Sequence, residues 1–173
     1  MDQYQALLNS GILYAFKRDK GFRPIFIVNV KAIAKAKLDA DTLLKMMSYL
    51  FTFLINKTMV PGRVENWNFV FDLKGVGLTE IPKKQLKSMI QPLSNYFKGR
   101  LYRMYIVNAQ WTIKTLWKLI SKTVQPQILQ KFKVLGDNFS KDLLEMIDAD
   151  KLEERFGGTL PNKASDFFPP DLL

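Results

Sequence analysis

The chain has 173 residues and contains neither cysteine nor histidine. The absence of cysteine excludes disulfides and a thiolate nucleophile, and the absence of imidazole removes the commonest general base and most zinc sites. A composition without cysteine is typical of cytoplasmic proteins. The first residues show no basic region leading into an apolar run, so we expect no signal peptide and a cytoplasmic location.

Long hydrophobic runs are also scarce. The longest, Leu43–Ile55, is shorter than the roughly 17–25 residues that a helix needs to cross a bilayer. Lys45, Ser48 and Thr52 interrupt it at helical spacing, which predicts a helix of a soluble protein that is packed on nearly all sides. With 47% hydrophobic residues, the chain is long enough for one domain, residues 1–173, with a sizeable core.

Negative charge is missing from one third of the sequence. No Asp or Glu occurs from Ile81 to Gly136, although the whole chain has 16 acidic residues and a net charge of +10. The excess positive charge therefore belongs to this segment, which indicates a polyanionic partner such as an acidic membrane surface or a nucleic acid. Its basic residues are Lys83, Lys84, Lys87, Lys98, Arg100, Arg103, Lys114, Lys118, Lys122, Lys131 and Lys133.

Segments rich in β-branched and aromatic residues alternate with helical patterns, which predicts an α/β fold with a mixed, largely parallel sheet. The turn-like residues 17–23 predict a hairpin between the first two strands. The predicted strands are Ile12–Phe16, Pro24–Val30, Asn66–Leu73, Arg103–Ala109 and Lys131–Leu135. The predicted helices are Asp41–Asn56, Pro82–Phe97, Thr112–Val124 and Lys141–Phe156, with caps at Asp41–Thr42 and Thr112 and a stop at Gly157–Gly158. The residues after Gly158 are expected to wrap the surface.

In the predicted strand Asn66–Leu73, Trp67, Phe69, Phe71 and Leu73 point to one face, because successive residues of a strand point to opposite faces. In the strand Arg103–Ala109, Met104, Ile106 and Asn108 alternate with Tyr105 and Val107. A mixed sheet this apolar must be covered on its faces by helices or by a ligand.

The sequence offers no arrangement suited to catalysis. The loop Lys74–Gly77 follows a strand, but it lacks both the third glycine of a dinucleotide site and the Lys-Ser/Thr pair of a P-loop. Asp148 and Asp150 lie at the start of a predicted helical turn, where acidic residues favour the helix dipole. No serine lies in a nucleophile elbow. We therefore predict a binding or carrier protein and not an enzyme, with no catalytic residue and no metal site.

The predicted helix Thr112–Val124 has an apolar face bordered by a ridge of lysines. Such a helix either packs on the sheet with its lysines in water or lies in a membrane interface. Each lysine near an anionic bilayer contributes on the order of 1 kcal/mol, which is enough for reversible docking. Trp111 precedes the helix, its apolar residues are Ile113, Leu116, Trp117, Ile120 and Val124, and the ridge consists of Lys114, Lys118 and Lys122.

The order of these motifs resembles the CRAL-TRIO lipid-binding family, especially its phosphatidylinositol-transfer branch. Residues 18–30, RDKGFRPIFIVNV, are similar to the family's D-x-x-G-R-P-V hairpin, and FDLKGVGL follows at 71–78. YIVNAQW at 105–111 is similar to Y-I-I-N-A-P-W/F, and FKVLG follows at 132–136. LLEMIDADKLEERFGG at 143–158 is similar to L-x-x-x-I-x-x-x-x-L-P-x-x-x-G-G. Five such pieces in the correct order are a specific signal.

The resemblance implies a sheet floored and covered by helices that encloses an apolar pocket for one lipid. It makes Trp67, Phe69, Phe71, Met104 and Ile106 the pocket wall. Residues Trp111–Val124 become a gate helix that opens the pocket on a membrane, and Lys131 matches the family's headgroup lysine. We expect a monomer that associates peripherally with acidic membranes, transfers or presents a phospholipid, and needs no cofactor besides the bound lipid.

The sequence departs from the family at several positions. The two hydroxyl residues that hold a phosphatidylcholine headgroup are Trp67 and Phe69 here, and neither can replace hydroxyl bonds to a phosphate. The family has a headgroup threonine three residues before the lysine, and this position is Ile128 here. The glutamate of the family's Y-P-E-R motif is replaced by Gly99. Gln110 replaces the usual proline, and Leu152–Glu153 replaces the Leu-Pro pair. We expect a chain without the small helical domain that often precedes this fold, either a minimal member of the family or a trimmed chain.

Other functions stay open beside phospholipid transfer. The Trp67–Phe69 face has no polar anchor, which leaves room for a neutral ligand such as a sterol or an isoprenoid. A lipid-sensing module that docks on a membrane or a protein is a further alternative. We predict no nucleic-acid partner, because the aromatic residues alternate into apolar strands and form no stacking platform among exposed basic residues.

Overall fold

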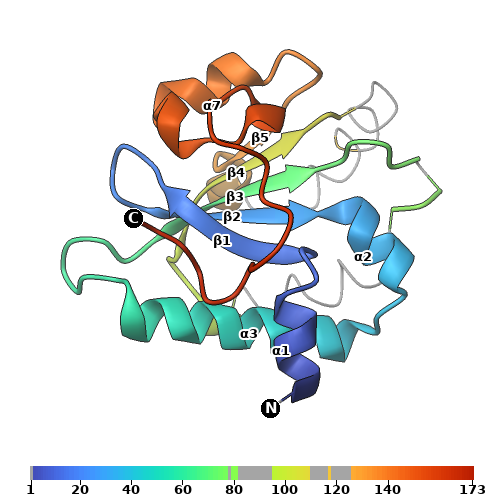
Figure 1. Ribbon diagram of the computed structural model, residues 1–173. Helices are drawn as coiled ribbons and strands as arrows, with labels where there is room; N and C mark the ends of the chain where they lie inside the picture. Colours follow the sequence, from blue (N-terminus) through green and yellow to red (C-terminus); the bar gives the residue numbers. More distant parts are fainter. Residues whose placement is uncertain (1, 78, 82–94, 110–116, 118–125) are drawn as a thin grey trace.

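The computed structural model describes residues 2–77, 79–81, 95–109, 117 and 126–173. A five-stranded sheet in the order β1-β2-β3-β4-β5 forms its centre (Figure 1). Strands β1 (Leu13–Arg18) and β2 (Pro24–Asn29) form an antiparallel hairpin. Strands β3 (Trp67–Asp72), β4 (Leu101–Val107) and β5 (Phe132–Val134) continue the sheet parallel to β2. The predicted hairpin and the largely parallel sheet are confirmed.

Helices α1 (Asp2–Leu8) and α3 (Ala40–Lys57) cover one face of the sheet (Figure 1). The side of α3 that faces the sheet buries Leu43, Met46, Met47, Leu50, Phe51 and Leu54. The cap of α3 is Asp39 and not the predicted Asp41–Thr42, because the Asp39 carboxylate accepts the Thr42 backbone N–H at 2.8 Å. A short helix that the sequence did not predict, α2 (Val30–Ala36), follows β2 directly and is capped by the Asn29 side chain.

The opposite face is covered by α7 (Ser140–Met146) and by two short 3₁₀ turns, Ala149–Lys151 and Glu154–Phe156. The prediction of one helix over Lys141–Phe156 is wrong beyond Met146. The backbone is extended at Ile147 and again at Leu152, which turns both side chains into the core and ends each helical segment. Gly157, with a φ of 95°, ends the last turn as predicted.

Parts of two predicted helices lie outside the described residues. Of Pro82–Phe97 the structure describes residues 95–97, and of Thr112–Val124 it describes Trp117. The chain continues with α6 (Pro126–Leu129), which leads into β5.

The C-terminal tail crosses the molecule beside β1, as predicted for a segment that wraps the surface (Figure 1). Phe16 and Asp171 form a parallel bridge, and the Lys17 N–H donates to the Asp171 carbonyl at 2.8 Å. Farther back in the tail, the buried Phe167 ring lies 4.7 Å from the Tyr14 ring.

A buried carboxylate connects this tail to the sheet. Glu153 is 1% exposed. Its carboxylate oxygens accept hydrogen bonds from the Tyr14 hydroxyl at 2.9 Å, from the Arg155 guanidinium and from the Lys163 backbone N–H at 2.6 Å. Burial, followed by the Glu153 charge, raises the pKa of Tyr14, so its hydroxyl keeps the proton that it donates.

We expect Glu153→Ala to lower the free energy of unfolding by about 3 kcal/mol, because it removes the carboxylate that pairs with the half-buried Arg155 and that accepts the Tyr14 hydroxyl and the Lys163 N–H. Urea denaturation followed by tryptophan fluorescence measures this. The neighbouring Glu154→Ala, at an exposed position, is the control and should stay within about 0.5 kcal/mol of the unchanged protein. Equal losses in the two variants would contradict the role of the buried carboxylate.

Candidate functional site

The five residues predicted as the pocket wall lie together on one face of two adjacent strands. Phe69 of β3 pairs with Met104 of β4, and Phe71 pairs with Ile106. All of them, with Trp67, pack into the apolar cluster on the side of α1 and α3, whereas Val70 and Tyr105 belong to the opposite cluster. The alternation predicted for both strands is therefore confirmed. Contact of these residues with a ligand stays a prediction.

One half of this face is filled by aromatic side chains of the protein itself. Trp67 and Phe69 are only 2% and 6% exposed. The ring of Phe51, from α3, lies 4.8 Å from that of Trp67, and the ring of Phe26, from β2, stacks at 5.0 Å on Phe69. Phe97 also contacts Phe51, at 5.0 Å. This half is closed core, and the two strand positions where the family has hydroxyl residues are occupied here by buried aromatic rings.

The other half of the face is less covered. Phe71, Met104 and Ile106 are only half-buried, although each packs against the same apolar cluster. These three residues form the part of the predicted wall that the aromatic cluster leaves accessible. Any apolar ligand of this face would therefore meet them before it met Trp67 or Phe69.

Trp117 is the described residue of the predicted gate helix, and it lies against the same face. Its ring stacks on that of Phe132 in β5, with centroids 5.0 Å apart and planes 28° apart. Phe132 shares a face with Val134, which packs into the α1–α3 cluster. The remaining predicted gate residues lie outside the described part of the chain: Trp111, Ile113, Lys114, Leu116, Lys118, Ile120, Lys122 and Val124.

Lys131, the predicted headgroup residue, lies at the amino ends of β4 and β5. Its Nζ donates to the Leu101 carbonyl at 2.6 Å, which brings it beside the segment that contains Gly99. In the described part of the chain no ion pair includes Lys131. The neighbouring Lys133, in contrast, pairs with Asp142 at 3.5 Å. Gly99, which stands for the glutamate of the family's Y-P-E-R, therefore lies two residues from the carbonyl that Lys131 binds.

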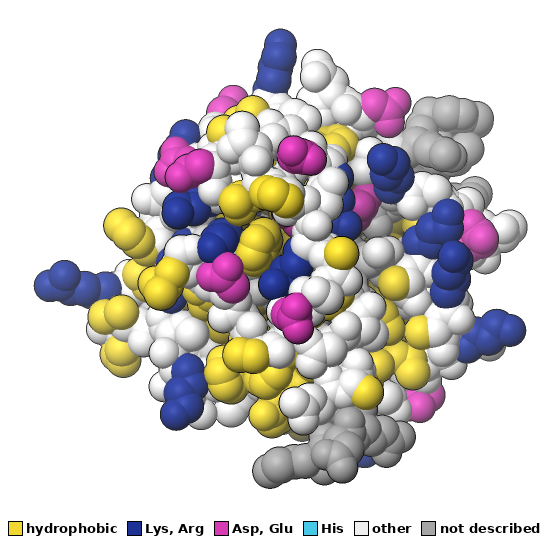
Figure 2. All heavy atoms as spheres, in the orientation of Figure 1, with side chains coloured by type: hydrophobic (Ala, Val, Ile, Leu, Met, Phe, Trp, Pro, Cys, Tyr) yellow, Lys and Arg dark blue, Asp and Glu magenta, His cyan; other side chains and the backbone are white. Residues whose placement is uncertain are grey.

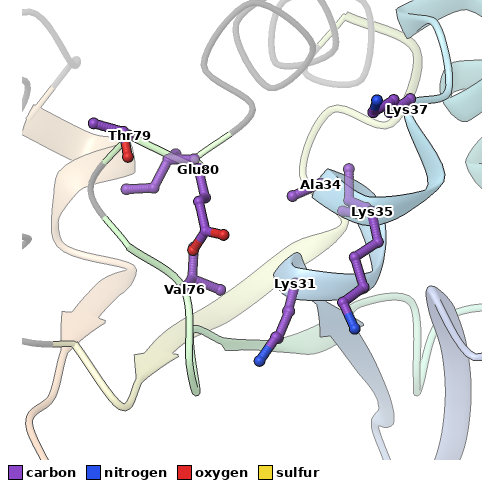
Figure 3. A pocket seen from close by; sticks show the side chains of 9 residues that line it. Lys31, Ala34, Lys35, Lys37, Val76, Thr79 and Glu80 are labelled. Carbon is purple, nitrogen blue, oxygen red and sulfur yellow. The ribbon is translucent and has the colours of Figure 1, made fainter.

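A cleft of about 380 Å³ lies at the other end of the sheet, between α2 and the segment after β3 (Figure 3). Three lysines and Glu80 line it, and the Glu80 carboxylate accepts the Gly77 N–H at 2.7 Å. A charged lining of this kind does not suit a hydrocarbon tail. The lining residues are Lys31, Ile33, Ala34, Lys35, Lys37, Val76, Thr79, Glu80 and Ile81.

Residues 8–158 of the chain match the CRAL/TRIO domain. The chain belongs to this family. Within the residues that the structure describes, no helix is both long and apolar enough to cross a membrane, and no cluster of acidic residues could hold a metal ion.

Curated relatives extend this match. The phosphatidylinositol/phosphatidylcholine transfer protein SFH4 of Arabidopsis thaliana is 29% identical over 154 residues, which are 82% of this chain and 25% of that protein. The Sec14 cytosolic factor of Schizosaccharomyces pombe is 27% identical over 172 residues, 91% of this chain and 59% of that protein. The chain thus spans between a quarter and three fifths of these relatives. They confirm the resemblance to the phosphatidylinositol-transfer branch of the CRAL/TRIO family.

A solved structure confirms the fold. The crystal structure of Sfh5 superposes with a TM-score of 0.67 at 20% identity, covering 92% of this chain and 58% of that one. The expectation of a CRAL/TRIO fold, a mixed sheet with helices on its faces, is therefore confirmed.

One departure from the CRAL/TRIO motifs has a structural role that sequence reasoning missed. Glu153, which stands where the family pattern has proline, is the buried acceptor that binds Tyr14 and the tail. The signal was present in the sequence, since Arg155 follows two residues later and can pair with it. Its partners on β1 and in the tail are far away in sequence and could not be inferred.

If Met104 lines a cavity that holds a ligand, Met104→Trp should fill part of it and reduce the co-purified lipid by at least about half, because close packing leaves no room for both. Met146→Trp is the matched control, since Met146 is also half-buried but lies on the α7 side of the sheet. Native mass spectrometry measures the bound fraction, and thermal melting checks that both variants fold. An undiminished lipid load in Met104→Trp would remove this residue from the wall.

Proposed function

We propose that this chain binds a single phospholipid or related lipid on the α1–α3 side of its sheet and transfers or presents it between membranes. The observation that carries the proposal is the unequal cover of this apolar face. Trp67 and Phe69 are closed by the protein's own rings, whereas Phe71, Met104 and Ile106 remain half-buried on a strand pair next to Trp117. An acyl chain is the class of ligand that such a surface favours.

The energetics of an acyl chain suit exchange in both directions. Burying a methylene group away from water contributes about 0.8 kcal/mol, but a lipid in a bilayer has already gained that energy. Moving the chain from a bilayer into an apolar pocket is therefore close to neutral in free energy. The protein would load and unload without a chemical step, with no catalytic residue, and the lipid would be its cargo.

Lys131 is our proposed contact for the headgroup phosphate. Its Nζ is bound to a neutral backbone carbonyl and not to a carboxylate, so an incoming phosphate can replace that acceptor and gain a charged hydrogen bond. This favours an anionic phospholipid. The name of the Arabidopsis relative gives phosphatidylinositol and phosphatidylcholine as what that protein transfers.

A neutral hydrophobic ligand is the second candidate. Phe71, Met104 and Ile106, the half-buried side chains of this face, carry no strong hydrogen-bonding group that could orient a polar headgroup. A sterol or an isoprenoid needs few such bonds and would suit this part of the face. In either case we propose a monomer in the cytoplasm that associates peripherally with membranes.

We expect native mass spectrometry of the purified chain to show one bound lipid, and we expect the chain to move labelled lipid between two vesicle populations. The transfer assay separates a carrier from a module that only docks. If the chain sediments with vesicles but transfers no lipid, it acts as a docking module and not as a carrier. A ligand-free mass combined with no uptake from vesicles would refute the proposal.

Lys131→Ala should weaken uptake of phosphatidylinositol about tenfold, the equivalent of one lost charged hydrogen bond of roughly 1.4 kcal/mol. Lys133→Ala removes the same charge two residues away, from a side chain engaged with Asp142, and should leave uptake unchanged. Uptake is measured from vesicles that contain phosphatidylinositol or a sterol. Unchanged phosphatidylinositol uptake by Lys131→Ala would exclude the headgroup role, and uptake of sterol alone would favour the neutral ligand.

A further inference from the structure

Three loops lie side by side where the parallel strands begin. They are residues 19–23 together with Arg18 at the end of β1, residues 58–66 together with Lys57 at the end of α3, and residues 97–100 together with the helical residues 95–96 that precede them. Figure 1 shows the first two on the left side of the sheet, opposite α2. We call this side of the molecule the amino edge.

Half-buried arginines join these loops into one surface. The Arg18 guanidinium donates to the Phe22 carbonyl at 2.8 Å and to the Thr58 carbonyl at 3.0 Å, which connects the first loop to the second. The Arg100 guanidinium donates to the Glu65 carbonyl at 2.8 Å, which connects the third loop to the second. The loops are therefore held in fixed relative positions.

These bonds leave positive charge at the amino edge. Arg18 and Arg100 donate to neutral carbonyls, so no carboxylate cancels either guanidinium in these contacts. Burial lowers the pKa of Arg18, but an arginine pKa lies so far above neutrality that the side chain stays charged. Among the described arginines of this region, Arg23 is the one that pairs with a carboxylate. Its guanidinium lies 3.1 Å from a carboxylate oxygen of the buried Asp19.

Each loop also presents a large apolar side chain to solvent. Phe22 is 70% exposed, Val60 50% and Tyr96 76%. Phe22 has a φ of 62°, and its N–H donates to the Asp19 carbonyl, so the turn itself holds the ring outward. Figure 2 shows apolar and basic side chains next to one another along this left side of the molecule.

Exposed basic residues accompany these apolar side chains. Lys57, Arg63 and Lys98 are exposed, and no ion pair of the described residues includes any of them. Glu65 is the exposed carboxylate of the three loops, and it accepts the Gly62 N–H at 3.0 Å. The amino edge therefore has a strong excess of positive charge.

We propose that the amino edge docks on an anionic bilayer through Phe22, Lys57, Val60, Arg63, Tyr96 and Lys98. Aromatic and aliphatic side chains at loop tips enter the headgroup region, and lysines and arginines among them bind the lipid phosphates and carboxylates. This surface shares no residue with the predicted gate helix. It lies beside Lys131, at the same ends of β4 and β5, so docking would bring a headgroup site to the membrane.

The choice of a bilayer as partner rests on the proposed function. The charge alone would also suit a nucleic acid, but the exposed side chains at the loop tips include the aliphatic Val60, which offers no stacking surface for a base. Insertion into a headgroup layer uses aliphatic and aromatic side chains equally well.

Charge reversal tests the proposal. Lys57→Glu/Arg63→Glu/Lys98→Glu should weaken sedimentation with vesicles of phosphatidylcholine and phosphatidylserine by at least about tenfold, since each basic residue near such a surface contributes roughly a fivefold step in affinity. Lys31→Glu/Lys35→Glu/Lys37→Glu reverses the same number of charges on and after α2, at the opposite end of the sheet, and should retain binding. Equal losses in the two variants would overturn the proposal, because the total charge would then explain binding.

A second pair of variants does not alter charge. Phe22→Asn/Tyr96→Ser should weaken sedimentation severalfold, and asparagine tolerates the left-handed backbone at position 22. Tyr49→Ser, at a side chain of α3 that is 52% exposed, is the control and should bind as the unchanged protein does. Unchanged binding by Phe22→Asn/Tyr96→Ser would overturn the apolar part of the surface, whatever the charge variants show.

The two proposals can fail separately. Native mass spectrometry of the amino-edge variants should show an undiminished lipid load, because none of the substituted residues belongs to the proposed wall. A protein that never holds lipid but loses vesicle binding on charge reversal would refute the proposed cargo and support the docking surface. Loss of RNA binding on charge reversal, in a protein that does not sediment with vesicles, would assign the amino edge to nucleic acid instead.

Discussion

The structure depends on the two-residue repeat of β3. Its odd-numbered residues are large and aromatic and lie in the α1–α3 cluster, whereas the even-numbered Asn68 and Asp72 connect parts of the fold that lie far apart in sequence. Asn68 donates to the buried Asp19 carboxylate at 2.8 Å, which fixes the β1–β2 hairpin. Asp72 accepts the Asn108 amide at 2.7 Å, which fixes the point where the chain leaves β4. One strand thus supplies an apolar wall and two polar attachment points.

Each side of the sheet is consequently specialised. The α7 side is packed with Phe139, Leu143, Ile147 and Phe156 and is closed by the tail, so it provides rigidity. The α1–α3 side changes along its length from closely packed rings at Trp67 to half-buried side chains at Ile106. A lipid site on this face would therefore lie beside two well-packed regions, the α7 side of the sheet and the aromatic half of its own side.

The features predictable from sequence are those that depend on local periodicity and turn chemistry. The hairpin followed from the turn-forming residues 17–23, and the face of each wall residue followed from the repeat of β3 and β4. The break after Met146 did not, because residues 147–156 keep a helical pattern of apolar side chains while the sheet surface requires extended backbone at Ile147 and Leu152. The closure of Trp67 by Phe51 also depends on how close α3 approaches the sheet, which no spacing in the sequence specifies.

The pairing of the tail with β1 affects more than local packing. In the order of the sheet β1 is a terminal strand, so the backbone groups on its outer side have no neighbouring strand to bind. The bridge between Phe16 and Asp171 occupies part of this side, and the Lys17–Asp171 ion pair at 2.8 Å places charge next to it. Unpaired strands at the margin of a sheet are the usual starting points for association between identical molecules. The tail therefore occupies part of the edge along which a second copy of the sheet could otherwise pair.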